Sequence, residues 1–98
     1  MAEEPIALAI TGELDLHTFR PQDVKDLVPE YLEECRKRGL LVVRIVHGKG
    51  RGTLRRTVQA LLARQAGVAS YALASAPFGA WGATLVRLRP AEPPETGR

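Results

Sequence analysis

Two short segments of this sequence bring side chains that can move protons close to side chains that can bind anions. The first is Leu14-Asp15-Leu16-His17, in which a carboxylate stands two residues before an imidazole. A carboxylate at that spacing can orient a histidine, share a proton with it or help to hold a cation. Taken alone, the pair is explained more simply as a surface aspartate beside a histidine that hydrogen bonds to the backbone.

The second segment is a glycine-punctuated basic loop that runs from His47 to Gly52. Its three glycines allow positive φ and close approach of the backbone to a ligand, and Lys49 and Arg51 add positive charge. The amides of such a loop and the start of a following helix form an anion site. The residue order fits neither a Walker A loop nor a GxGxxG loop. A plain strand-to-helix turn with solvated basic side chains explains the segment equally well.

The hydrophobic pattern predicts the elements that position these segments. Alternation predicts a strand over Glu13–His17, with its two leucines buried and its acidic and imidazole side chains on the opposite face. A helix is predicted from Pro21 to a stop signal at Gly39, and Pro29 is expected to kink or split that helix. The carboxylate and the imidazole of the first segment are therefore expected on one side of a strand end.

The second half of the chain repeats the strand-helix pattern and then adds two strands. Leu40–Val46 is predicted as a strand buried on both faces except at its one arginine, and Thr53 is expected to cap a second helix that ends at Gly67. The segments Val68–Ala74 and Ala83–Leu88 are predicted as an antiparallel pair. These elements place the glycine-rich loop between a strand end and a helix start.

The element order strand, helix, strand, helix, strand, strand predicts one two-layer α/β domain. A mixed sheet with both helices on one face is expected, joined by right-handed parallel crossovers. The chain has 98 residues, which suits a single domain. Residues 1–12 are expected to form an N-terminal extension, residues 13–89 the domain, and residues 90–98 a flexible tail.

If the first two strands are parallel neighbours, their carboxyl ends lie side by side. Asp15, His17, His47 and Lys49 would then converge on one phosphate-sized spot. One histidine would take a proton from a water or a 2′-hydroxyl, the other would protonate the leaving oxygen, and Lys49 with the loop amides would stabilise the transition state. The aspartate with two histidines could also hold a divalent cation.

Charge is unevenly distributed along the chain, although the net charge is only +3. Residues 1–34 hold nine acidic and two basic side chains, whereas residues 35–91 hold eleven basic and no acidic ones. Such a distribution favours a polyanionic partner. The single cysteine, Cys35, fits a reducing compartment, and no apolar run is long enough for a membrane span. A cytoplasmic protein without a membrane partner is expected.

Three motifs together resemble the Smr (small MutS-related) domain, namely Leu14 to His17, His47 to Gly50, and Gly79 to Thr84. The resemblance implies a fold like the carboxyl-terminal domain of translation initiation factor three, and an endonuclease that nicks DNA or cleaves RNA. It implies that Asp15, His17 and His47 are catalytic. The nucleic-acid-binding residues expected from the loop, its charges and the third motif are Gly48, Lys49, Gly50, Arg51, Gly52, Arg55, Trp81, Gly82 and Thr84.

One departure from the family pattern is Thr18, which stands where the family usually has glycine and would alter the loop's approach to substrate. Trp81 would either stack on a base or pack over the sheet edge. The alternative function is a nucleic-acid or ribosome-binding module without catalysis. A small phosphate-ligand enzyme would need a closed pocket. DNA and RNA are both expected partners, with the ribosome or repair machinery as further ones; oligomeric state and metal dependence are left open.

Overall fold

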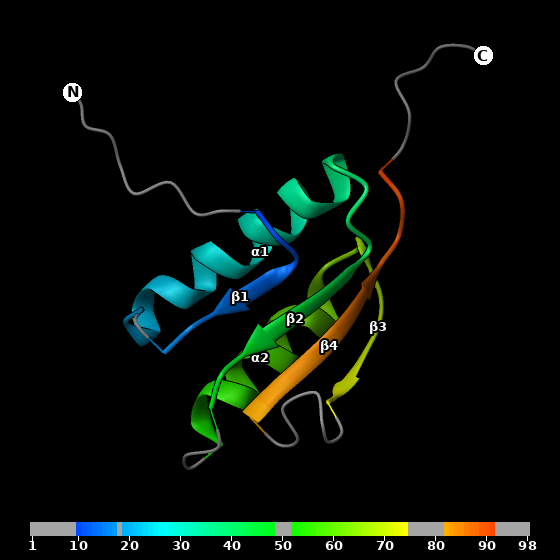
Figure 1. Ribbon diagram of the computed structural model, residues 1–98. Helices are drawn as coiled ribbons and strands as arrows, with labels where there is room; N and C mark the ends of the chain where they lie inside the picture. Colours follow the sequence, from blue (N-terminus) through cyan, green and yellow to red (C-terminus); the bar gives the residue numbers. More distant parts are fainter. Residues whose placement is uncertain (1–9, 18, 49–51, 75–81, 92–98) are drawn as a thin grey trace, which may run out of the picture.

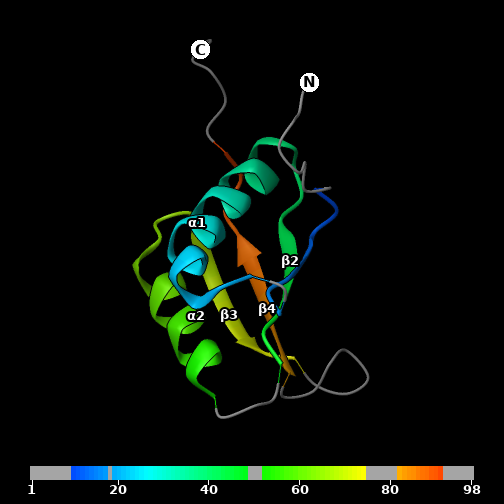
Figure 2. The ribbon, with the colours of Figure 1, turned by 90° about the vertical axis from the view of Figure 1, so that its left-hand side faces the viewer.

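The computed structural model describes residues 10–17, 19–48, 52–74 and 82–91, which form a four-stranded sheet with both helices on one face (Figures 1 and 2). The elements, in chain order, are β1 (Glu13–Asp15), α1 (Pro21–Lys37), β2 (Val42–Val46), α2 (Thr53–Arg64), β3 (Val68–Leu73) and β4 (Ala83–Leu88). The predicted fold class and element order are confirmed.

The sheet has the strand order β1-β2-β4-β3, so the strand that comes last in the chain lies inside the sheet. β1 is parallel to β2, while β4 runs antiparallel to both of its neighbours, β2 and β3. The predicted antiparallel pairing of the last two strands is therefore confirmed, and so is the parallel pairing of the first two.

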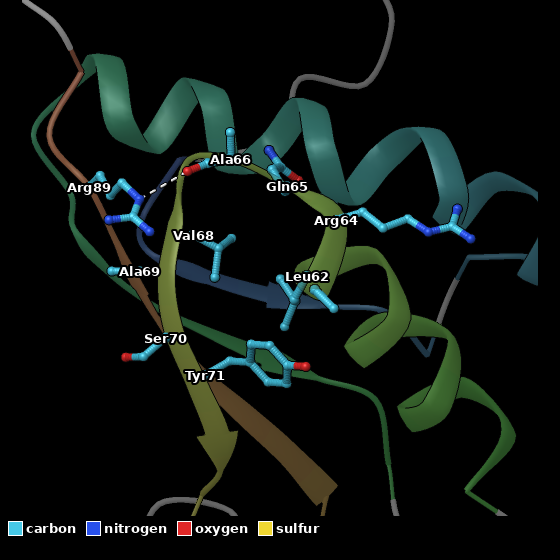
Figure 3. A pocket seen from close by; sticks show the side chains of 10 residues that line it. Leu62, Arg64, Gln65, Ala66, Val68, Ala69, Ser70, Tyr71 and Arg89 are labelled. Carbon is cyan, nitrogen blue, oxygen red and sulfur yellow. Dashed lines mark hydrogen bonds between the residues drawn. The ribbon is translucent and has the colours of Figure 1, made fainter.

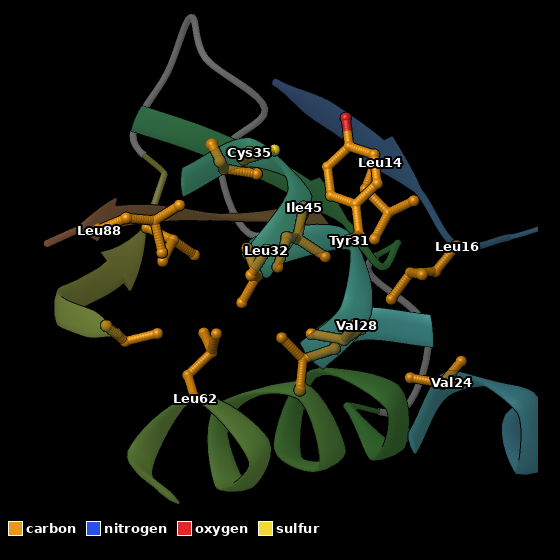
Figure 4. Close-up of a cluster of buried hydrophobic side chains, with 14 residues drawn as sticks. Leu14, Leu16, Val24, Val28, Tyr31, Leu32, Cys35, Ile45, Leu62 and Leu88 are labelled. Atoms are coloured by element: carbon orange, nitrogen blue, oxygen red, sulfur yellow. The ribbon is translucent and has the colours of Figure 1, made fainter. Parts of the chain in front are cut away.

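The core lies between the sheet and the two helices (Figure 4). The two leucines of the first segment, Leu14 and Leu16, are buried there as predicted. α1 and α2 each contribute one apolar stripe, because their buried residues recur at helical spacing. The other buried hydrophobic members of this cluster are Val24, Val28, Tyr31, Leu32, Cys35, Val43, Ile45, Val58, Leu62, Val68, Val86 and Leu88.

β2 corrects the expectation of a strand buried on both faces. Val43 and Ile45 are fully buried, but Val42 is 57% exposed and its alternate neighbours are only partly buried. The physical reason is that both helices cover the same face of the sheet, so only every second side chain of β2 reaches the core. The opposite face of the sheet, called the open face below, carries the other side chains.

α1 continues through Pro29 as one helix, so the predicted split is wrong. A single missing amide hydrogen bond does not end a helix whose apolar stripe is packed on both sides of the proline. The Pro29 carbonyl also accepts a hydrogen bond from Gln65 Nε2 at 3.3 Å, which links α1 to the end of α2. In the ranges that the structure describes, no helix is long and apolar enough to cross a membrane.

Arg36 fastens the end of β4 to α1. Its guanidinium donates to the carbonyls of Arg89 and Pro90 at 2.8 and 3.2 Å and to the Glu33 carboxylate at 2.8 Å. Gly67 was expected to end the second helix, but α2 ends at Arg64. Gly67 instead makes room for this arginine, since a Cβ there would lie 2.8 Å from Arg36 Cδ.

Candidate functional site

The carboxyl ends of β1 and β2 lie side by side, as the sequence predicted. Asp15 pairs with Val46, and the Leu16 amide donates to the Val46 carbonyl at 2.8 Å. The start of β1 is anchored by Tyr31, whose hydroxyl donates to the Glu13 carbonyl and accepts from the Gly12 amide, both at 3.1 Å. This anchoring role of the tyrosine was not predicted from the sequence.

Asp15 and His17 form a hydrogen-bonded pair at the end of β1. The distance from His17 Nδ1 to Asp15 Oδ1 is 2.7 Å, and the same oxygen accepts the His17 amide at 3.1 Å. These bonds lower the pKa of Asp15, the side-chain bond having the largest effect. Because an ionised carboxylate only accepts, Nδ1 carries a proton and Nε2 of the neutral ring is left as an acceptor. The His17 side chain is 71% exposed, so Nε2 is open to a ligand.

His47 has a very different environment, because its residue exposure is only 6%. Both ring nitrogens are engaged, with Nε2 2.8 Å from Thr84 Oγ1 and Nδ1 3.0 Å from the Gly48 carbonyl oxygen. Burial lowers the pKa of His47, and the charge of Arg55 acts in the same direction, against the opposing effect of the Gly48 carbonyl. The neutral ring therefore donates from Nδ1 to Gly48 and accepts the Thr84 hydroxyl at Nε2.

The two imidazoles have separate hydrogen-bond partners. Thr84, the partner of His47, pairs with Ile45 and is fully buried on the helix-covered face, whereas the exposed His17 is bonded to Asp15, which pairs with Val46. That both rings converge on one phosphate stays a prediction. The alternation that buries Ile45 simply continues to His47 at the end of β2. Lys49, the fourth expected member, lies outside the described residues.

The glycine-rich loop is tied to the start of β4 at its first residues. The amides of His47 and Gly48 both donate to the Gly82 carbonyl at 2.9 Å, and Gly48 has φ +82°. Gly82 and Thr84 are buried, so both support the loop from within the protein. Of the other expected binding residues, Gly50, Arg51 and Trp81 lie outside the residues that the structure describes, as does Thr18.

The loop leads into α2, whose N-cap is Gly52 with φ +83°. No side chain among the described residues caps this helix, so the predicted capping role of Thr53 is wrong. The first helical amides are therefore left for another acceptor. The guanidiniums of Arg55 and Arg56 fold back over the same point, since a Cβ on Gly52 would lie 3.1 Å from Arg55 Nη2 and 3.7 Å from Arg56 Nη1.

Metal binding was left open by the sequence, with Asp15 and the two histidines as candidate ligands. Among the described residues, no group of three or more histidine, cysteine, aspartate or glutamate side chains could hold a metal ion. In this structure His17 is bonded to Asp15, and His47 is bonded to Thr84 and to the Gly48 carbonyl.

The buried histidine predicts a loss of stability on mild acidification. The unfolded chain protonates His47 near its ordinary pKa of 6.5, whereas the folded chain resists protonation because the folded pKa is lowered. The unfolded state then binds more protons, so the free energy of unfolding should fall as the pH drops from 6.5 towards the folded value. Urea unfolding of wild type and His47→Gln between pH 7.5 and 5 tests this. His47→Gln should flatten this part of the profile; an unchanged slope in that variant would contradict the assignment.

The comparisons with known proteins agree on one family. The model of the Smr domain matches residues 14–89. "Endonuclease MutS2" of Thermus thermophilus is 40% identical over 78 residues, covering 80% of this chain and 10% of that protein, and "Endonuclease MutS2" of Acetivibrio thermocellus is 35% identical over 83 residues, covering 85% and 10%. The chain thus spans about a tenth of the length of these curated relatives.

Two solved structures share the fold. The crystal structure of the Smr domain of Thermus thermophilus MutS2 superimposes with a TM-score of 0.77 at 39% identity, covering 82% of this chain and all of that one. YdaL of Escherichia coli, a stand-alone small MutS-related protein, superimposes with a TM-score of 0.75 at 28% identity, covering 80% of this chain and 64% of that one.

Proposed function

Since this chain belongs to the Smr domain family, we propose that it is a nucleic-acid endonuclease that nicks DNA or cleaves structured RNA through contacts with the phosphate backbone. The observation that carries the proposal is the exposed Asp15–His17 pair at the end of β1, with a 2.7 Å bond from ring to carboxylate. The MutS2 relatives are named endonucleases, and they supply the reaction class.

In the proposed mechanism His17 is the general base. Its Nε2 takes the proton of a water or of a 2′-hydroxyl, the oxygen attacks phosphorus, and the bond from phosphorus to the leaving oxygen breaks. Asp15, bonded to Nδ1, keeps the ring in the tautomer that accepts at Nε2 and stabilises the imidazolium that forms. Solvent protonates the leaving oxygen, because both ring nitrogens of the buried His47 are already hydrogen bonded.

Phosphate binding is assigned to the loop after β2 and the start of α2. Gly48, Gly52 and the first amides of α2 supply donors, and Arg55 with Arg56 supplies charge. Lys49, Gly50, Arg51 and Trp81 remain predicted contacts from the sequence. Three expected site residues remain, namely His47, Gly82 and Thr84. Their proposed role is to position the loop from inside the protein.

The proposal is tested by nicking of supercoiled plasmid and by cleavage of a structured RNA, with wild type compared to the double variant Asp15→Ala, His17→Ala. Both side chains are exposed, so the double variant should fold normally while losing cleavage. Equal activity of the two purified proteins would mean that a contaminating nuclease is being measured, and would end the claim of catalysis.

One observation favours the alternative, a binding module without catalysis. Only one of the two imidazoles expected in the site is exposed, so the acid and base of a two-histidine mechanism are not both available. This alternative would be supported if wild type bound DNA or RNA but cut neither in the presence of Mg²⁺ or Mn²⁺, and if the double variant bound equally well.

Arg55→Ala is expected to weaken binding and to make it less sensitive to salt. Removal of one phosphate contact should reduce the slope of log affinity against log salt by about 1. Fluorescence anisotropy of a labelled DNA hairpin and a labelled RNA hairpin between 50 and 200 mM salt measures the slope. Lys25→Ala, which removes an exposed cation from α1, is the matched control. An identical slope in Arg55→Ala and wild type would remove Arg55 from the proposed interface.

A further inference from the structure

β3 forms an unusually accessible edge of the sheet. The opposite edge strand, β1, has only three residues, and two of them, Glu13 and Asp15, are charged. β3 has six residues, Val68–Leu73, without a charge or a proline, and five of the six are exposed. Proteins usually protect a free edge with charges, prolines or short strands, because its unpaired backbone groups invite another strand. β3 lacks these three protections, although its register with β4 shifts between Val68 and Ser70.

The register shows which backbone groups of β3 face outwards. The Ala74 amide donates to the Ala83 carbonyl at 2.9 Å, so this directly opposite pair is a hydrogen-bonded one. Hydrogen-bonded and non-hydrogen-bonded pairs alternate along antiparallel strands. Leu73 and Tyr71 therefore belong to non-bonded pairs with β4, and their N–H and C=O groups point to the free edge.

A hollow of about 570 Å³ lies along this edge, between β3 and the end of α2 (Figure 3). On its helix side Tyr71 and Leu62 form an apolar wall, and Tyr71 is 37% exposed. Its lining residues include Arg64 and Arg89, and among the described residues that line it none is acidic. An incoming strand would thus find apolar contacts on this side and no acidic side chain among the described lining residues.

The open face beside β3 is also positive. Arg87 of β4 stands opposite Ser70 and is exposed, and its neighbours on β3, Ser70 and Ala72, have small side chains. A fifth strand would alternate its side chains between the two faces. Apolar residues would face the hollow and acidic residues would face Arg87.

From this geometry we infer that the free edge of β3 receives an extended peptide segment of a partner protein, in which apolar residues alternate with acidic ones. The segment adds as a fifth strand, bonded to the outward N–H and C=O groups of Tyr71 and Leu73. The inference concerns a different edge of the sheet from Asp15 and His17, so it is independent of the proposed cleavage reaction.

The observations favour an acidic peptide over the other occupants. A nucleic acid lacks the alternating amide donors and carbonyl acceptors, repeated about every 3.3 Å, that match a strand edge. A second copy of this chain would bring the same uncharged strand and the same Arg87, and the two arginines would repel each other, whereas an acidic segment complements Arg87.

The experiment uses the full chain and a capped ten-residue peptide of alternating valine and glutamate as the probe. Amide exchange followed by NMR should slow at Tyr71 and Leu73 on addition of the peptide, because these amides become hydrogen bonded. A matched peptide of alternating valine and lysine should bind at least about tenfold more weakly, because like charges oppose it.

Two variants test the contacts separately. Arg87→Glu should reverse the preference between the two peptides, while Lys25→Glu on α1, the matched charge reversal, should leave it unchanged. Tyr71→Pro should weaken binding of the acidic peptide about tenfold by removing one outward donor. Circular dichroism checks that each variant is folded. If Tyr71→Pro is not folded, the result with Arg87→Glu decides the outcome.

The inference is overturned if the acidic peptide does not bind at millimolar concentration, if it protects other amides, or if Arg87→Glu leaves the preference unchanged. Protection of Tyr71 and Leu73 by a ten-nucleotide single-stranded DNA instead of the peptide would assign this edge to nucleic acid. Protection that appears with protein concentration alone would assign it to a second copy. Plasmid nicking, measured in parallel, tests the proposed cleavage separately and does not bear on whether the peptide binds to β3.

Discussion

Replacing His17 with alanine is expected to slow cleavage by about 10²- to 10⁴-fold, the usual contribution of one general base. The side chain is largely exposed and contacts Asp15 rather than the core, so the free energy of unfolding should change by less than about 0.5 kcal/mol. Single-turnover cleavage of plasmid and of structured RNA, beside urea unfolding of the same preparations, measures both quantities. A large loss of stability would contradict the exposed position of His17.

Asp15→Asn should also slow cleavage, although it keeps the size of the side chain. The carboxylate of Asp15 stays ionised at neutral pH because its pKa lies below the ordinary value of 3.8, whereas an amide carries no charge to stabilise the imidazolium. Asp26→Asn, which removes the same charge from the exposed side of α1, is the matched control and should cleave normally. Equal rates for the two variants would show that Asp15 acts only through overall charge.

Thr84→Val is expected to destabilise the fold by about 1–3 kcal/mol, because it leaves the buried Nε2 of His47 without a donor. Valine keeps the volume of threonine, so this cost comes from the lost hydroxyl and not from a cavity. Urea unfolding at pH 7.5 should show a lower midpoint with an unchanged slope. A midpoint equal to that of wild type would mean that the His47–Thr84 bond contributes no stability.

Two further variants separate the hydrogen bond from the packing. Thr84→Ser keeps the donor and removes one methyl group, so it should cost only about 0.8 kcal/mol. Combining Thr84→Val with His47→Phe removes both polar partners, so the double variant should be less destabilised than the sum of the two single changes. Strict additivity would show that the two side chains are not coupled.

Much of the scaffold could be predicted because its signals are local. The alternation around Leu14 and Leu16 gave the buried face of β1, and Pro21 marked the start of α1. The ends of α2 were less predictable, since Thr53 and Gly67 carry the residue types of caps but are used otherwise. In both places a glycine decides the outcome, through the positive φ of Gly52 and the space that Gly67 leaves for Arg36.

The site was predicted in its backbone and in the Asp15–His17 pair, but not in the surroundings of His47. Parallel β1 and β2 bring Asp15 and Val46 together as expected, whereas the imidazole of His47 is buried against Thr84. The sequence did contain a signal for the burial of His47, because Val43, Ile45 and His47 are alternate residues and alternate residues of a strand point to the same face. The continuous apolar run of residues 40–46 concealed it, since a strand buried on both faces has no polar side to which a following histidine can be assigned.

The position of β4 between β2 and β3 has a consequence for how the domain is made. During synthesis the first three strands leave the ribosome before Ala83–Leu88, yet β3 has no place in the sheet until that segment joins it to β2. A nascent chain that stops short of residue 83 can therefore form helices but not the complete sheet. Folding of this domain should be a single late event, completed only when its final strand is released.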